Sequence, residues 1–193
     1  MPTLADAHDG GLAVRQATGS TVGSLFAAQA RLHPQAPALD DGVRRYTYGE
    51  LELRRLRLAA ALAARGVGLG DRIAVLSENR LDYLELVLAA AHLGAMVACQ
   101  NWRLAPPELA HCLNMVDPRL VFASPTHVEK LKACGWRGGE VLLFGEASEA
   151  LQQEASPAGQ LASTAPEPAV FDPETPLLIL YTSGTTGLPK GAV

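Results

Sequence analysis

The chain has 193 residues, of which 48% are hydrophobic and 19% are charged, and its formal net charge at pH 7 is −4. This composition is typical of a folded globular protein and excludes a chain that is disordered throughout. The mild acidity does not favour a nucleic-acid-binding protein, because such proteins usually carry a strongly basic face.

The first predicted elements are a leader, a helix and a hairpin. Residues 1–20 have no apolar segment, so they do not resemble a secretory signal, and we expect a disordered leader. Thr21 can N-cap a helix that runs to about Leu32, with Leu25, Phe26, Gln29 and Leu32 on neighbouring turns. The pair Asp41-Gly42 lies between two short extended runs and predicts a β-hairpin.

Residues 50–65 predict a second helix, with leucines on one side and four arginines among the other positions. The arginines are either a phosphate-binding patch or the solvated face of an amphipathic helix, and the pattern favours the solvated face. They are Arg54, Arg55, Arg57 and Arg65.

Short apolar strands then alternate with helices. We predict strands at 73–76, 95–98, 119–123 and 141–144, and helices at 79–93 (capped by Asn79 and stopped by Gly94), 106–115 and 125–134. Continuous apolar strands separated by helices are typical of a mostly parallel sheet with helices on both faces. We therefore assign residues 21–146 to an α/β subdomain.

The alternation fails in residues 147–176, which are rich in Ala, Pro, Ser and Glu. We interpret this segment as a variable helix followed by a Pro/Ala-rich linker. Residues 177–193 then open the next subdomain with an apolar strand at 177–181. If this strand ends the sheet, it exposes an apolar edge, which favours aggregation.

A loop rich in Gly and hydroxyl side chains follows that strand, with the sequence YTSGTTGLPKG over residues 181–191. Its glycines permit a turn in which successive backbone N–H groups bind an anion, and Lys190 adds a positive charge. Open α/β sheets bind ligands at the carboxyl ends of their strands. The loop therefore predicts a polyphosphate site, and the alternative interpretation is a polar surface turn.

Two common nucleotide motifs do not fit this loop. A Walker A loop needs Gly-Lys followed by Ser or Thr, whereas here Pro189 precedes Lys190 and Gly191 follows it. The loop also lacks GxGxxG, which excludes the dinucleotide fingerprint and the kinase glycine-rich loop.

Residues 181–191 resemble the phosphate-loop signature of the AMP-forming acyl-CoA synthetases. These belong to the adenylate-forming superfamily, with the adenylation domains of peptide synthetases and the luciferases. Three earlier blocks, at 46–51, 66–75 and 93–109, resemble the same family, so the resemblance extends over about residues 21–193. It implies that the fold is the N-terminal part of the large domain of these enzymes, and that it is incomplete.

The resemblance also implies which residues bind the cofactor. The loop residues would contact the phosphates of ATP, chiefly the β and γ groups, while its glycines shape the loop. The predicted cofactor-binding residues are Thr182, Ser183, Gly184, Thr185, Thr186, Gly187 and Lys190.

In this family the magnesium-binding glutamate, the acyl pocket and the catalytic lysine follow the phosphate loop in the sequence. We therefore predict no catalytic residue and no metal ligand among these 193 residues. The implied cofactors are ATP, Mg²⁺ and coenzyme A, the last two bound mainly by residues outside this chain. The implied partners are a small carboxylic acid and the remainder of the enzyme chain.

The resemblance leaves three functions open. The first is the N-terminal part of an ATP-dependent carboxylate–CoA ligase for a fatty or aromatic acid. The second is an adenylation domain that loads a carrier protein. The third is a truncated, non-catalytic fragment that at most binds nucleotide phosphate.

The sequence also predicts a cytoplasmic protein without a membrane span. The uncharged run 86–102 is short and is interrupted by Gly94 and Gln100, so we interpret it as a helix followed by a buried strand. The three cysteines form no CxxC pair, so we expect reduced thiols rather than disulfides or a zinc site.

Overall fold

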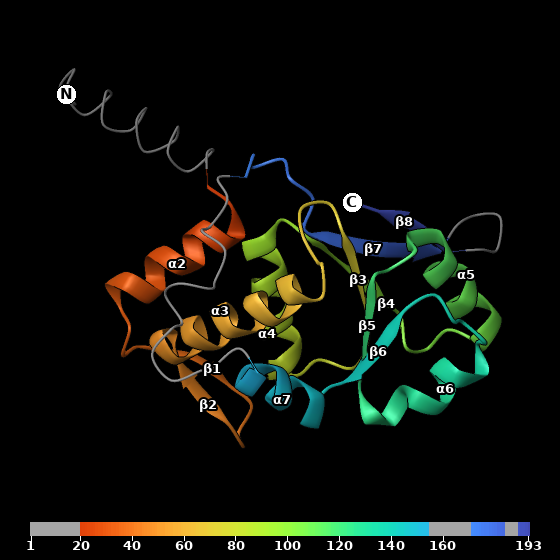
Figure 1. The fold of residues 1–193 in the computed structure, drawn as a ribbon, viewed down its shortest axis with the longest axis horizontal. Helices are drawn as coiled ribbons and strands as arrows, with labels where there is room; N and C mark the ends of the chain where they lie inside the picture. Colours follow the sequence, from red (N-terminus) through yellow and green to blue (C-terminus); the bar gives the residue numbers. More distant parts are fainter. Residues whose placement is uncertain (1–19, 155–170, 184–188) are drawn as a thin grey trace, which may run out of the picture.

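A six-stranded sheet with strand order β6-β5-β3-β4-β7-β8 organises the fold. The computed structural model describes residues 20–154, 171–183 and 189–193 (Figure 1). Neighbouring strands are parallel except for β7 and β8, which are antiparallel. The strands of this sheet are β3 (Arg72–Leu76), β4 (Met96–Gln100), β5 (Leu120–Ala123), β6 (Glu140–Leu143), β7 (Leu178–Ser183) and β8 (Pro189–Ala192).

Helices cover both faces of the sheet (Figure 1). On one face, α3, α4 and α7 pack on a core that includes Ile73, Val75 and Phe122; on the other, α5 and α6 pack on Ala74, Leu76 and other residues. This arrangement confirms the predicted α/β class with a mostly parallel sheet. The helices are α2 (Val22–Leu32), α3 (Tyr48–Ala64), α4 (Leu81–Leu93), α5 (Pro106–Val116), a 3₁₀ turn η1 (Pro125–His127), α6 (Val128–Ala133) and α7 (Glu146–Glu154).

The predicted hairpin forms from β1 (Pro37–Asp40) and β2 (Arg45–Thr47), and it leads directly into α3. Thr47 Oγ1 accepts a hydrogen bond from the Glu50 N–H at 3.3 Å, and Glu50 Oε2 accepts one from the Thr47 N–H at 2.8 Å. This reciprocal capping satisfies two backbone donors that the first helical turn leaves unpaired. The block at 46–51 is therefore the join between the hairpin and the helix.

One of the two predicted boundaries of α4 differs from the structure. Asn79 does not cap α4, because the N-cap is Arg80 and the helix begins at Leu81. The C-terminal boundary at Gly94 is confirmed, since Gly94 has φ 68° and a Cβ there would lie 2.5 Å from Cε1 of Phe171. In α2, Leu25 and Leu32 are exposed and the buried residues, Gly23 and Ala30, are small.

The interpretation of the α3 arginines as a solvated face is wrong for Arg54 and Arg55. Arg54 Nε donates to Glu85 at 2.7 Å and Arg54 Nη2 donates to Glu149 at 2.6 Å, which ties α3 to α4 and α7. Arg55 is buried and donates to Glu52 at 2.6 Å. The hydrogen-bond partners of these arginines are protein carboxylates and, for Arg55, also the His92 ring at 2.9 Å, so Arg54 and Arg55 do not form a phosphate patch either.

A second buried carboxylate fixes the start of α4. Asp82 is buried and accepts hydrogen bonds from Arg44 at 3.0 and 3.1 Å and from Arg80 at 2.9 Å. Burial alone would raise the pKa of Asp82, but these hydrogen bonds outweigh burial and hold it below its usual value of 3.8. Burial raises the pKa of the neighbouring Glu85 above its usual value, and Arg54 offsets this only in part.

Several predictions lie outside the described residues. The leader is described only at residue 20, and residues 155–170 of the predicted linker are also outside. The described start of the 147–176 segment is helical, within α7. None of the described helices is long and apolar enough to cross a membrane. The three cysteines are free thiols.

Replacing Arg54 with Met should destabilise the protein, because it leaves the buried Glu85 without its charged partner. We expect the free energy of unfolding to fall by about 3 kcal/mol, measured by urea denaturation. The control is Arg45→Met, which removes an exposed pair with Asp40 and should cost much less, because surface ion pairs contribute little to stability. Equal losses in the two variants would contradict the account of the buried cluster.

Asp82→Asn should weaken the acid dependence of stability. A carboxyl with a lowered pKa in the folded state stabilises it above the unfolded pKa, and this stability is lost as the pH falls. Urea midpoints between about pH 6 and about pH 3 should therefore fall more steeply for the wild type than for Asp82→Asn. Glu85→Gln is the matched control, because the pKa of Glu85 is shifted upward and its removal should not flatten the acid limb.

Candidate functional site

The predicted phosphate loop begins in β7 and ends in β8, and these two strands pair as an antiparallel hairpin. Thr182 lies opposite Lys190 in this ladder, and Ser183 lies opposite Pro189. The strand β8 was not predicted, and it corrects the expectation of a bare edge, because β7 is paired with β8 from Leu180 onward. Of the predicted site residues, Thr182, Ser183 and Lys190 fall in described strands, while Gly184, Thr185, Thr186 and Gly187 lie outside the described residues.

Thr182 and Lys190 lie on the same face of the hairpin. Directly opposed residues of an antiparallel pair point to the same side, and their Cβ atoms are about 4.5–5.5 Å apart. Both residues are exposed. The ladder therefore brings a hydroxyl donor and an ammonium group together at the carboxyl end of β7, the edge at which open α/β sheets bind ligands.

The opposite face of the hairpin packs toward α5. Ile179 is buried there and Tyr181 packs against the same core. Gly191 lies opposite Tyr181, and a Cβ at this position would lie 3.2 Å from Ile179 Cγ2 and 3.6 Å from the Met115 sulfur. The glycine thus lets β8 approach the side chains beneath it, and a Cβ at this position would push the Ile179 side chain aside.

Polar contacts also anchor the base of the hairpin. Gln100 is buried at the end of β4, and its Nε2 donates to the Tyr181 hydroxyl oxygen at 2.9 Å. The Tyr181 hydroxyl in turn donates to the Cys112 carbonyl of α5 at 3.3 Å. Burial raises the pKa of Tyr181 to about 12. The hydroxyl therefore remains protonated, and able to donate, at neutral pH.

An apolar groove lies beside the hairpin on the Thr182 face. It has a volume of about 600 Å³ and is lined by side chains of α4, β4 and β7, among them Val87, Cys99 and Leu180. Leu180 is two residues before Thr182, so the two side chains point to the same side of the strand. The exposed surface next to the predicted phosphate site is therefore apolar.

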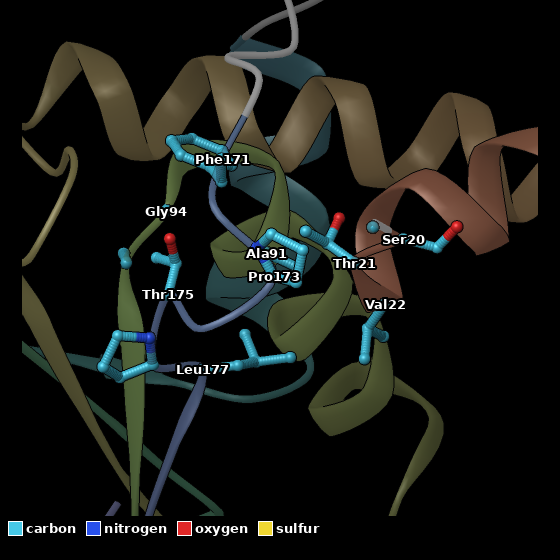
Figure 2. A pocket seen from close by; sticks show the side chains of 12 residues that line it. Ser20, Thr21, Val22, Ala91, Gly94, Phe171, Pro173, Thr175 and Leu177 are labelled. Atoms are coloured by element: carbon cyan, nitrogen blue, oxygen red, sulfur yellow. The ribbon is translucent and has the colours of Figure 1, made fainter. Parts of the chain in front are cut away.

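A smaller cavity of about 200 Å³ lies at the other end of β7. Figure 2 shows Phe171 and Pro173 beside the start of α2 and the end of α4, with Leu177 below them. Leu177 immediately precedes β7, so this cavity adjoins the amino end of the strand, whereas the phosphate loop follows its carboxyl end. Of the residues predicted to bind phosphate, the two whose side chains are described, Thr182 and Lys190, do not line it.

The described residues do not form a magnesium site. Within residues 20–154, 171–183 and 189–193, no group of three His, Cys, Asp or Glu side chains could hold a metal ion. The side chains that the structure brings together at the hairpin are cationic and hydroxylic, which fits phosphate oxygens and not a divalent cation.

Comparison with known proteins decides the family. The family described as AMP-binding enzyme matches residues 26–193. The chain belongs to this family. Its curated relatives are ligases that join acids to CoA or to a carrier protein, and the match includes the phosphate loop and the three earlier blocks.

Three relatives illustrate the range of the family. A feruloyl-CoA synthase from Amycolatopsis is 36% identical over 178 residues, which is 89% of this chain. A fatty acid–[acyl-carrier-protein] ligase from Streptomyces coeruleorubidus is 37% identical over 85% of this chain, and a long-chain-fatty-acid–CoA ligase from Thermus thermophilus is 35% identical over 78%. The chain spans about a third of the length of these relatives, with 33%, 31% and 28% covered.

Solved structures share the fold. VinN in complex with 3-methylaspartate matches with a TM-score of 0.78 and 26% identity, over 90% of this chain and 47% of VinN. A crystal structure named as a long-chain-fatty-acid CoA ligase from Rhodopseudomonas palustris has a TM-score of 0.76 and 28% identity, over 90% of this chain and 44% of the other. These matches confirm that the fold is the N-terminal part of an adenylate-forming enzyme.

Gly191→Ala should loosen the hairpin, because the added methyl group would lie only 3.2 Å from Ile179 Cγ2. We expect faster amide hydrogen exchange in residues 178–192, with the exchange of β3 and β5 unchanged. Gly68→Ala is the matched control, since a Cβ there meets nothing within 4 Å. Unchanged exchange in the hairpin of Gly191→Ala would contradict the close packing under α5.

Proposed function

We propose that the β7–β8 hairpin binds the triphosphate of ATP in an AMP-forming reaction that activates a carboxylic acid. The observation that carries the proposal is the register of the hairpin, in which exposed Thr182 and Lys190 lie opposite each other at the carboxyl edge of the sheet. Family membership supports the nucleotide as the ligand. Ser183, Gly184, Thr185, Thr186 and Gly187 complete the proposed site.

The proposed reaction has two steps. The substrate carboxylate attacks the α-phosphorus of ATP, which forms an acyl-adenylate and releases pyrophosphate. The thiolate of coenzyme A then attacks the acyl carbon, which forms a thioester and releases AMP. The first step is controlled mainly by positioning and by charge stabilisation on the phosphates, the role that we assign to the hairpin.

Lys190 and the hydroxyl side chains would act on the leaving group. A lysine ammonium is a flexible point charge that stabilises negative charge on the β- and γ-phosphates as pyrophosphate departs. Hydroxyl groups and backbone N–H groups would donate to the remaining phosphate oxygens. Mg²⁺, when bound, would supply further charge neutralisation.

The proposal also names the chemical class of the acid substrate and of the acceptor. The names of the relatives cover aromatic acids, such as ferulate, and fatty acids, so we propose a fatty or aromatic acid as the substrate and CoA as the acceptor. Loading of a carrier protein is the second candidate, because a relative named as a carrier-protein ligase is 37% identical. Assaying the protein at its full natural length with CoA and with a carrier protein separates the two. We place the enzyme in the cytoplasm, on the support of its free thiols.

Lys190→Ala should reduce adenylate formation more than the second step. We expect the rate of carboxylate-dependent ATP–pyrophosphate exchange to fall about 100-fold, as for the loss of a charge that stabilises a transition state. Thioester formation from supplied acyl-adenylate should change much less, because pyrophosphate has already left.

The control for this variant is Lys132→Ala, which removes another exposed lysine, paired with Glu129 on the surface of α6. It should leave both steps unchanged. Equal damage to the two steps in Lys190→Ala would contradict the assignment of Lys190 to the phosphates. Wild-type protein of full natural length that binds ATP without any pyrophosphate exchange would favour a non-catalytic nucleotide-binding protein.

A further inference from the structure

We propose that Gln100 and Tyr181 are positioning residues that hold the phosphate-binding hairpin in its register for ATP. This inference rests on the proposed function of the hairpin. Neither residue belongs to the set predicted to contact phosphate, and both side chains lie on the face of the sheet away from Thr182 and Lys190.

The need for such a support follows from the way β7 leaves the sheet. The parallel pairing of β4 with β7 comprises only Val97 with Leu178 and Ala98 with Ile179. After Ile179, the ladder partner of β7 is β8 alone. β4 continues to Gln100 beside this part of β7, but no further backbone pairs join the two strands, so side chains must hold the hairpin there.

The hydrogen bond between Gln100 and Tyr181 bridges this opening. Gln100 is the last residue of β4 in register with β3, opposite Leu76, so its backbone is fixed by the centre of the sheet. Its Nε2 donates both to the Ala98 carbonyl at 3.3 Å and to the Tyr181 hydroxyl at 2.9 Å. The Gln100 amide thereby fixes the position of the Tyr181 side chain, which lies on the part of β7 that has no backbone pairs with β4.

Tyr181 is also placed to control the position of Lys190. Its ladder partner is Gly191, the residue next to Lys190, and its hydroxyl donates to the Cys112 carbonyl of α5. The ring is thus held at two points, by β4 and by α5. Because Tyr181 and Gly191 are the neighbours of Thr182 and Lys190 in the ladder, a displacement of Tyr181 also displaces the Thr182–Lys190 pair. Small displacements of groups that position a reacting centre lower the reaction rate.

The test uses Tyr181→Phe and Gln100→Met, which keep side-chain volume and remove the hydrogen bond. In the protein at its full natural length, each variant should lower kcat/KM for ATP in pyrophosphate exchange about tenfold, mainly by raising KM for ATP. KM for the carboxylic acid should stay within about twofold of wild type. Because both substitutions break one bridge, the double variant should lose about as much as Tyr181→Phe alone, not the product of the two losses.

The matched control is Tyr83→Phe. Tyr83 is another largely buried tyrosine, and its hydroxyl is hydrogen-bonded to Cys99 on the opposite face of β4. It should leave KM for ATP unchanged. A wild-type KM for ATP in Tyr181→Phe would overturn the proposal, as would equal rises in KM for both substrates accompanied by a similar loss of stability.

Hydrogen exchange without nucleotide separates this inference from the proposed function. In Tyr181→Phe and Gln100→Met, the amides of residues 190–192 should exchange about tenfold faster than in wild type, while those of β3 stay unchanged. Unaltered exchange in β8 would overturn the positioning role even if the enzyme is active. If the wild type shows no ATP–pyrophosphate exchange but the variants show faster amide hydrogen exchange in β8, the proposed function is rejected and the positioning role of Gln100 and Tyr181 is kept.

Discussion

The candidate site depends on a short parallel ladder between β4 and β7. Two residue pairs, Val97 with Leu178 and Ala98 with Ile179, join segments that are far apart in the sequence. This ladder places the end of β7 at the carboxyl edge of the sheet, where the chain turns back as β8. The position of the site is therefore determined by strand pairing between distant segments. The residues of the loop can bind a ligand at this edge only once that pairing has formed.

The two faces of the sheet stabilise the hairpin in different ways. On the α5 face, Gly191, Tyr181 and Gln100 allow the hairpin to pack closely and tie it to the sheet. On the α3 and α4 face, charged groups are buried in pairs, and Arg54 connects three helices through Glu85 of α4 and Glu149 of α7. Paired burial of this kind makes the removal of one partner costly, since the remaining charge is left without compensation. The helices thus hold the central strands, and the central strands hold the hairpin.

Sequence reasoning was most successful where a local signal decides the structure. Thr21, Gly94 and Pro106 mark helix boundaries through capping, a left-handed backbone and a fixed φ, and all three boundaries are confirmed. The phosphate motif identified the family for the same reason, because its residues are contiguous.

Predictions failed where residues that are distant in the sequence determine the structure. Arg54 looked solvated because its partners, Glu85 and Glu149, lie on other helices, and β8 was missed because a four-residue strand carries almost no periodic signal. Gln100 was visible as a polar interruption of an apolar run, but its partner Tyr181 could be found only in the fold.

The central claim is that the β7–β8 hairpin is the place where ATP is bound. Hydrogen exchange of the protein at its full natural length, with and without Mg·ATP, tests it most directly. The account predicts that nucleotide slows exchange in residues 178–192 and leaves residues 171–177, around the cavity in Figure 2, as they were. Slower exchange around that cavity, with the hairpin unaffected, would contradict the account and move the nucleotide to the opposite end of β7.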